Sequence, residues 1–140
     1  MKITTKGCPQ GSICGATFWN LAVEPYLHEL DSLQETDGVI AYADDIAVII
    51  GGNLRTELEN KARKILENLQ EWCKLNKLQI SEEKTVYMML KGKLQRKPTI
   101  RTNISIKRVK TTKYLGIVLD EDLNFMEHKI CIQQYTQSNE

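Results

Sequence analysis

The hydrophobic pattern of the chain predicts two amphipathic helices in its first half. Apolar residues recur at helical spacing from Ile13 to Leu30, and Ser12 is the expected N-cap of this helix. Pro25 should kink or interrupt the helix, because proline removes a backbone donor and crowds the preceding turn. A longer helix is expected from about Leu54 to Lys77, capped by Asn53, because its apolar residues repeat in alternating steps of four and three.

Two short apolar runs between these helices predict a β-hairpin. They flank the adjacent carboxylates Asp44 and Asp45, and glycines at Gly38 and Gly51-Gly52 bound the whole segment. The acidic pair should therefore lie at the tip of the hairpin.

The second half of the chain carries weaker strand signals and a short helical one. We expect strands at Thr85–Leu90 and Thr112–Asp120, the latter with Gly116 as a bulge or a close backbone approach. Ile104 and Ile106 alternate with polar residues, and a further helix is expected near Phe125–His128. Helices and strands alternate without clean βαβ repeats, which indicates an α+β fold: an antiparallel sheet with helices packed on one face.

Composition places the chain among ordinary globular proteins. Its 140 residues suit one domain, and 41% hydrophobic and 26% charged residues are usual values. The N-terminal residues have no apolar signal core and no run is long enough for a membrane span, so an intracellular protein without membrane contact is expected. The four cysteines lack Cys-x-x-Cys spacing, which favours reduced structural thiols.

A net charge of +1 hides a strong segregation of charge along the chain. Residues 84–113 hold 10 basic side chains and no acidic one, whereas residues 1–83 and 114–140 are both net acidic. A basic block of this kind favours contact with a polyanion such as nucleic acid, although a solvated basic face remains the alternative.

The acidic pair needs an explanation, because burying an unpaired carboxylate is costly. No lysine or arginine lies between Asp31 and Leu54, so the neighbouring sequence offers no ion pair. Carboxylate oxygens are preferred by hard cations such as Mg²⁺. These residues alone leave two interpretations open, a solvated hairpin turn and a metal site.

Several motifs together resemble the reverse transcriptases of non-LTR retrotransposons, in the family's order and over about Lys6 to His128. The details from residue 84 onward are most similar to arthropod elements of the class that inserts into ribosomal RNA genes. The motifs are Gly7-Cys8-Pro9-Gln10-Gly11-Ser12, Phe18-Trp19-Asn20, Tyr42-Ala43-Asp44-Asp45, Lys84-Thr85 with Met88-Met89-Leu90-Lys91-Gly92, Tyr114-Leu115-Gly116-Ile117, and Asn124-Phe125 with His128.

The resemblance implies the palm subdomain of a right-hand polymerase and a role for each motif. Asp44 and Asp45 would hold catalytic Mg²⁺, with Mn²⁺ as a possible substitute, and Lys84 would approach the triphosphate as a cation or proton donor. Binding of the template and nucleotide would fall to Pro9, Gln10, Gly11, Ser12 and Tyr42, and Tyr42 would also lie near the primer end. Primer binding would fall to Tyr114, Leu115 and Gly116.

The resemblance also implies partners and a domain layout. The partners would be an RNA template, a DNA primer, deoxynucleoside triphosphates and the remaining segments of the parent polymerase, in the nucleus if the parent element is functional. Residues 1–128 would be a partial reverse transcriptase domain without fingers, upstream catalytic strand or thumb, and residues 129–140 a frayed tail. Ala16 stands where the family usually has proline. Two hypotheses follow: a polymerase fragment that is inactive alone, or a remnant that only binds nucleic acid or protein.

Overall fold

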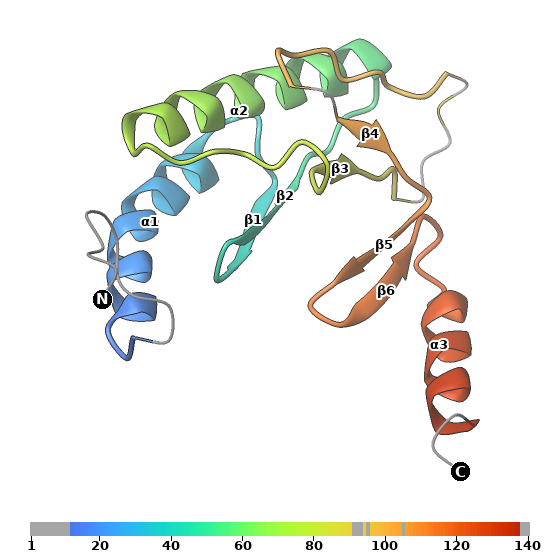
Figure 1. The fold of residues 1–140 in the computed structure, drawn as a ribbon. Coiled ribbons are helices and arrows are strands. Elements are labelled where there is room, and N and C mark those ends of the chain that lie inside the picture. Colours follow the sequence, from blue (N-terminus) through green and yellow to red (C-terminus); the bar gives the residue numbers. More distant parts are fainter. Residues whose placement is uncertain (1–11, 91–93, 95, 105, 138–140) are drawn as a thin grey trace. The chain divides into compact units, whose positions relative to one another are not determined.

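The computed structural model describes residues 12–90, 94, 96–104 and 106–137, and the chain divides between Leu78 and Gln79 into two compact units. The predicted site residues Pro9, Gln10 and Gly11 lie outside this described part. The elements, drawn in Figure 1, are α1 (Gly15–Ser32), β1 (Gly38–Tyr42), β2 (Asp45–Ile49), α2 (Arg55–Leu75), β3 (Val86–Tyr87), β4 (Lys107–Arg108), β5 (Thr111–Tyr114), β6 (Ile117–Asp120) and α3 (Met126–Gln137).

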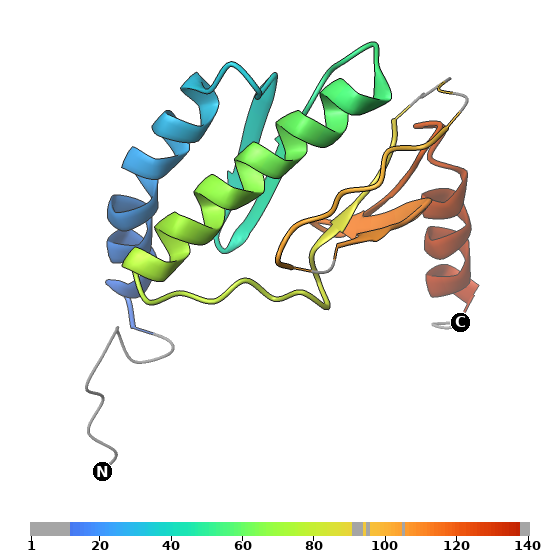
Figure 2. The ribbon, with the colours of Figure 1, turned by 90° about the horizontal axis from the view of Figure 1, so that it is seen from above.

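The first unit is built from α1, α2 and the β1–β2 hairpin, which lie beside one another in Figures 1 and 2. Its core centres on three buried side chains, Tyr26, Leu30 and Ile65. The rings of Tyr26 and Trp72 stack with their centroids 4.4 Å apart, which joins the two helices. The partly buried residues around this centre are Leu33, Val39, Ile46, Val48, Ile50, Leu69 and Trp72.

The antiparallel register of β1 and β2 separates the hairpin into two faces. Val39 pairs with Val48, so both side chains point to the same face, and both contact the core. Tyr42 pairs with Asp45 and Ile40 with Ala47, and these residues occupy the opposite face. Because Ile40, Tyr42 and Asp45 are exposed, this second face is open. The predicted hairpin, with helices packed on one face, is confirmed for this unit.

The long helix α2 confirms the predicted apolar stripe, with Ala62, Ile65 and Cys73 buried. Its N-cap is Leu54, and the expected Asn53 cap is wrong by one residue. The Asn53 amide instead donates to a side-chain oxygen of Glu57 at 3.1 Å, which occupies a backbone donor that would otherwise be free at the helix start.

Two details of α1 differ from the sequence prediction. Its N-cap is Cys14, and Ser12 contributes its carbonyl, which accepts a hydrogen bond from the Gly15 amide at 3.1 Å. Pro25 lies inside the helix without interrupting it, because the buried Val23, Tyr26 and Leu30 anchor the turns on both sides of the proline.

The second unit contains small pairs of strands and α3. β3 pairs with β4 in parallel, and β5 pairs with β6 in an antiparallel hairpin. The predicted antiparallel pairing is confirmed for two pairs of strands, but the described part of the chain has three two-stranded sheets in place of one sheet, and one of them is parallel. The structure therefore supports a mixed fold of helices and small sheets.

Three strand predictions in the second unit are corrected. The single strand expected at Thr112–Asp120 is the β5–β6 hairpin, and Gly116 lies in its turn rather than in a bulge. Only Val86 and Tyr87 of the strand expected at Thr85–Leu90 are in a ladder, and Ile104 and Ile106 precede β4 without belonging to it. A two-residue strand has too few residues to produce a clear strand pattern in the sequence.

The C-terminal helix α3 is longer than the short helical signal near residue 125. It extends to Gln137, so residues 129–137, expected as a frayed tail, are helical. The buried Asp120 carboxylate accepts hydrogen bonds from the amides of Asp122, Asn124 and Phe125, which fixes the turn before the helix. No helix in the described ranges is long and apolar enough to cross a membrane.

Candidate functional site

The two adjacent carboxylates lie at the tip of the β1–β2 hairpin, as predicted. Tyr42 and Asp45 are the last paired residues, so Ala43 and Asp44 form a two-residue loop. Ala43 has a φ of 51°, in the left-handed region that non-glycine residues rarely adopt. The indole N–H of Trp19, on α1, donates a 2.7 Å hydrogen bond to the Ala43 carbonyl. The turn is therefore attached to the helix next to it.

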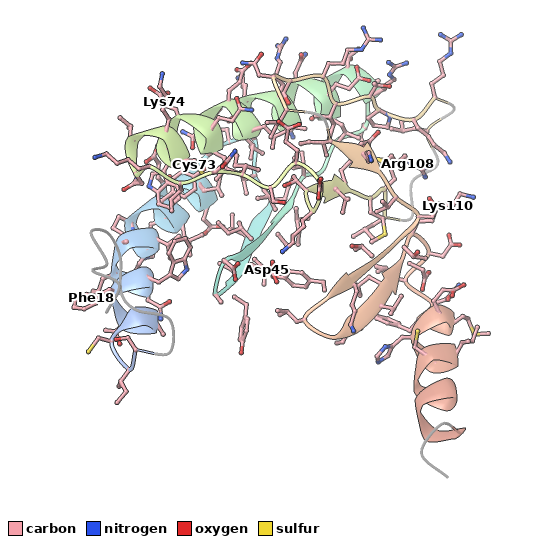
Figure 3. The ribbon with its side chains drawn as sticks, in the orientation of Figure 1. Phe18, Asp45, Cys73, Lys74, Arg108 and Lys110 are labelled. Carbon is pink, nitrogen blue, oxygen red and sulfur yellow. The ribbon has the colours of Figure 1, made fainter. Side chains whose placement is uncertain are left out.

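Both carboxylates are accessible at this tip. Asp44 and Asp45 are exposed, and neither belongs to an ion pair within the described residues. Tyr42 is 65% exposed and shares the open face of the hairpin with Asp45, its cross-strand partner. Figure 3 shows Asp45 near the end of the hairpin. One tyrosine and two acids are thus presented together to solvent.

The donors at the tip fit a hard divalent cation. Mg²⁺ in proteins is usually held by one or two carboxylates, with water and substrate phosphates completing its octahedral shell. Asp44 and Asp45 supply such carboxylates, and no ion pair found among the described residues occupies them. No group of three His, Cys, Asp or Glu side chains suited to a metal occurs among the residues that the structure describes. The pair can therefore contribute protein ligands to a cation that also binds water and phosphate.

A second turn collects the residues predicted to bind primer. Tyr114 pairs with Ile117, so Leu115 and Gly116 form the two-residue turn of the β5–β6 hairpin. Their φ angles are 49° and 84°, and two consecutive positive values suit the tight turns that match strand twist. The backbone and the exposed Leu115 side chain thus protrude at a hairpin tip, within the second unit.

The remaining predicted site residues have different settings. Lys84 is exposed in the turn before β3, and its amide donates to the Ser81 carbonyl at 3.2 Å. Ser12 lies just before α1. The structure brings Tyr42, Asp44 and Asp45 together in the first unit, and Tyr114, Leu115 and Gly116 together in the second.

The basic block is mostly exposed in the second unit. Arg108 differs from the rest because it is partly buried and forms an ion pair with Glu121. Figure 3 shows Lys110, in the bend between β4 and β5, directed outward. The exposed cations of the described part of the block are Lys84, Arg96, Lys97, Arg101, Lys107, Lys110 and Lys113.

Sequence reasoning identified Trp19 only as part of a motif and missed its contact with the acidic turn. A signal existed in the spacing: Trp19, Val23, Tyr26 and Leu30 follow steps of four, three and four, which places Trp19 at the end of the buried stripe of α1. That spacing indicates which side of the helix Trp19 occupies, but not which carbonyl it reaches.

The chain is similar to known retrotransposon proteins over most of its length. It is 39% identical over 128 residues to a retrovirus-related Pol polyprotein from the type-1 retrotransposable element R1 of Nasonia vitripennis, which covers 86% of this chain and 37% of that protein. It is 35% identical over 131 residues to a putative 115 kDa protein in the type-1 retrotransposable element R1DM of Drosophila melanogaster, covering 93% of this chain and 12% of that protein. It is 30% identical over 137 residues to an RNA-directed DNA polymerase from the mobile element jockey of Drosophila funebris, covering 95% of this chain and 15% of that protein.

The chain spans between 12% and 37% of the length of these relatives. No solved structure matches it significantly. A protein family described as reverse transcriptase (RNA-dependent DNA polymerase) matches residues 1–119. This match covers most of the chain, and the acidic hairpin lies within it. The chain belongs to the reverse transcriptase family.

Proposed function

We propose that this chain is a palm segment of the RNA-directed DNA polymerase of a non-LTR retrotransposon. The observation that carries the proposal is the acidic turn: Asp44 and Asp45, accessible at a hairpin tip beside the exposed Tyr42, in a chain of the reverse transcriptase family. An exposed carboxylate pair suits a reaction whose substrates are a polynucleotide end and a nucleoside triphosphate.

The proposed roles are those that the family resemblance implies, and the accessibility of each group supports them. Asp44 and Asp45 supply carboxylate oxygens to Mg²⁺, or to Mn²⁺ in its place. When bound, two such ions stabilise the attacking and leaving oxygens of an in-line phosphoryl displacement. Tyr42, on the same open face as Asp45, lies beside the primer end.

Further roles are assigned to residues outside the acidic turn. Lys84 is exposed and carries the positive charge needed next to a triphosphate. Tyr114, Leu115 and Gly116 offer a protruding turn for the primer strand. Ser12, together with Pro9, Gln10 and Gly11, is assigned to the template and nucleotide.

The substrates of the intact polymerase are an RNA template, a DNA primer and deoxynucleoside triphosphates, and its place of action is the nucleus. We propose that the 140-residue chain alone is inactive. Its acidic turn supplies two carboxylates, whereas the family resemblance implies a further catalytic strand upstream. The chain also spans a minor part of the length of its relatives. Primer extension on an RNA template with Mg²⁺ or Mn²⁺ tests this, and Asp44-dependent extension by the chain alone would overturn it.

Binding of Mn²⁺ to the chain tests the metal role directly. Electron paramagnetic resonance of free Mn²⁺ should show binding that is lost in Asp44→Asn and in Asp45→Asn. Asp31→Asn is the matched control, since Asp31 is an exposed acid near the end of α1. Equal binding by all four proteins would refute the assignment of these carboxylates.

A second candidate function, nucleic-acid binding without catalysis, is favoured by the basic block of the second unit. Fluorescence anisotropy with an RNA–DNA duplex across a salt series should show binding that weakens as salt rises. Reversing Lys107, Lys110 and Lys113 should lower the slope of log affinity against log salt by up to about 3, or about 1 for each phosphate that a lysine no longer neutralises.

The structure guides the choice of the reversed residues and of the control. Arg108 is left intact because its reversal would also break the ion pair with Glu121. Lys74→Glu is the matched control, because Lys74 is an exposed lysine on α2, outside the block, and is labelled in Figure 3. A slope unchanged by the three reversals would exclude this surface as the binding site.

A further inference from the structure

Trp19 occupies the end of α1 that faces the acidic turn. Its side chain continues the stripe of Val23, Tyr26 and Leu30, which are all buried. The neighbouring Phe18 is 57% exposed and is seen in Figure 3 on the side of α1 away from the hairpin. Trp19 itself is only partly exposed, because its indole ring turns inward toward β1–β2. The helix therefore places one aromatic N–H next to the hairpin tip.

The acceptor of this N–H is the carbonyl that precedes Asp44. The carbonyl of Ala43 belongs to the peptide group whose nitrogen is that of Asp44, so a 2.7 Å hydrogen bond to its oxygen restrains the plane of that peptide. The same residue, Ala43, has the unfavourable φ of 51°. A strained loop conformation persists when its surroundings restrain it, and the indole is a restraint that reaches the loop from another element.

The bond also leaves both carboxylates available. Trp19 donates to the backbone, so the side-chain oxygens of Asp44 and Asp45 are not consumed by the contact that orders the turn. A lysine or arginine restraint would instead neutralise the pair and compete with a cation. An uncharged donor directed at the main chain is therefore suited to holding a metal-binding turn.

We propose that Trp19 is a positioning residue for Asp44, acting through the Ala43 carbonyl. This inference rests on the proposed metal role of Asp44, and it adds a residue that does not itself touch the metal or the substrates. A tryptophan that merely filled space would need its ring but not its N–H, and this difference separates the two roles experimentally.

The decisive variant replaces Trp19 by benzothienylalanine, in which sulfur stands in place of the indole N–H and the bicyclic ring is kept. Trp19→Phe provides a second variant made only of natural residues. Phe18→Leu is the matched control, because it alters the adjacent aromatic residue on the exposed side of the same helix. All proteins are made as the 140-residue chain.

Two measurements are made on each protein. Nuclear magnetic resonance should show the Ala43 carbonyl and Asp44 amide signals shifted in both Trp19 variants, while signals of α2 stay in place. Mn²⁺ affinity, measured by electron paramagnetic resonance, should fall about three- to tenfold, as expected when one hydrogen bond that orders a site is removed. The benzothienylalanine variant should keep the thermal midpoint of the wild type to within a few degrees.

The outcomes separate this inference from the proposed function. Unchanged Ala43 and Asp44 signals in the benzothienylalanine variant would overturn the positioning role, as would an unchanged Mn²⁺ affinity in a wild type that binds the ion through Asp44. Loss of affinity in Phe18→Leu would also overturn it, by showing a general effect of the helix. If the wild type binds no Mn²⁺, the metal role fails, and the Ala43 and Asp44 signals still decide whether Trp19 orders the turn.

Discussion

The hydroxyl of Tyr26 provides a sharp test of how the first unit is stabilised. Tyr26 is 2% exposed, and its Oη is a buried atom without a hydrogen-bond partner in the described part of the structure. The ring is well placed, stacked on Trp72 with an interplanar angle of 18°. Tyr26→Phe keeps the ring and removes only the unsatisfied oxygen.

The expected effect is a gain in stability. An unsatisfied buried polar group costs about 1–3 kcal/mol, and loss of packing around the missing oxygen offsets part of this, so the free energy of unfolding should rise by about 1 kcal/mol. A unit of this size should then melt about 4–8 °C higher. Tyr26→Leu should instead lose stability, because it removes the aromatic stack, which is worth about 0.5–1.5 kcal/mol beyond burial.

Urea titration followed by the nuclear magnetic resonance signals of α1 and α2 measures both variants in the unit concerned. A Tyr26→Phe protein that is less stable than the wild type by more than about 0.5 kcal/mol would refute the reasoning, since it would mean that the hydroxyl makes a favourable bond.

The pH dependence gives an independent check. Burial raises the pKa of Tyr26 above its ordinary value. A group whose pKa is raised by folding stabilises the folded state fully when the pH is below its pKa in the unfolded state, which is about 10 for tyrosine. This stabilisation is lost as the pH rises through the pKa of the folded state. The wild type should therefore lose stability above about pH 10, and Tyr26→Phe should lack that component.

Three further predictions concern single side chains. Leu115→Gly should stabilise the second unit by about 0.5 kcal/mol, because glycine adopts the φ of 49° without strain; a lower thermal midpoint would contradict this. Asp120→Asn should cost about 2 kcal/mol and reduce helical circular dichroism, because the carboxylate accepts three amide hydrogen bonds ahead of α3. A hydrogen bond from Lys64 lowers the pKa of Glu35, so the stability from this pair is present above the unfolded pKa and lost as the pH falls through the folded one. Lys64→Met should raise the pKa of Glu35 toward its ordinary value in a carboxyl titration, and an unchanged pKa would exclude the pairing in solution.

Much of the first unit could be predicted from the sequence because local signals and packing agree there. The stripe that contains Ala62 and Ile65 has the period of a helix, and the helix buries that stripe. The hairpin was predictable because apolar runs surround Asp44 and Asp45 within a few residues. The interruption expected at Pro25 is wrong, since tertiary packing on both sides maintains the helix through it, whereas the kink stays a prediction.

The second unit was predicted less well because its signals conflict. Leu115, Ile117 and Leu119 alternate as in one strand, and the turn at Leu115-Gly116 lacks the Asn-Gly or Asp-Gly pair that usually marks a tight hairpin. The parallel pairing of β3 with β4 joins residues about twenty positions apart, and no local pattern specifies such pairing.

For the candidate site, the sequence could predict the chemistry of the residues but not their tertiary contacts. From the sequence alone, adjacent carboxylates without basic neighbours in the sequence left a solvated turn and a cation site both open. The bond from Trp19 to Ala43 spans 24 positions and depends on how α1 lies against the hairpin. The pairing of Arg108 with Glu121 likewise depends on tertiary structure, and it removes one member from the apparent set of exposed cations.

The division of the chain near Leu78 has a consequence for spectroscopy. Both tryptophans of the protein, Trp19 and Trp72, lie in the first unit, whereas the second contains tyrosine but no tryptophan. Intrinsic tryptophan emission is therefore a probe of the hairpin and its two helices alone. If the two units unfold separately, tryptophan emission and the nuclear magnetic resonance signals of the β5–β6 hairpin should give different midpoints, and the difference would measure how independently the acidic turn is folded.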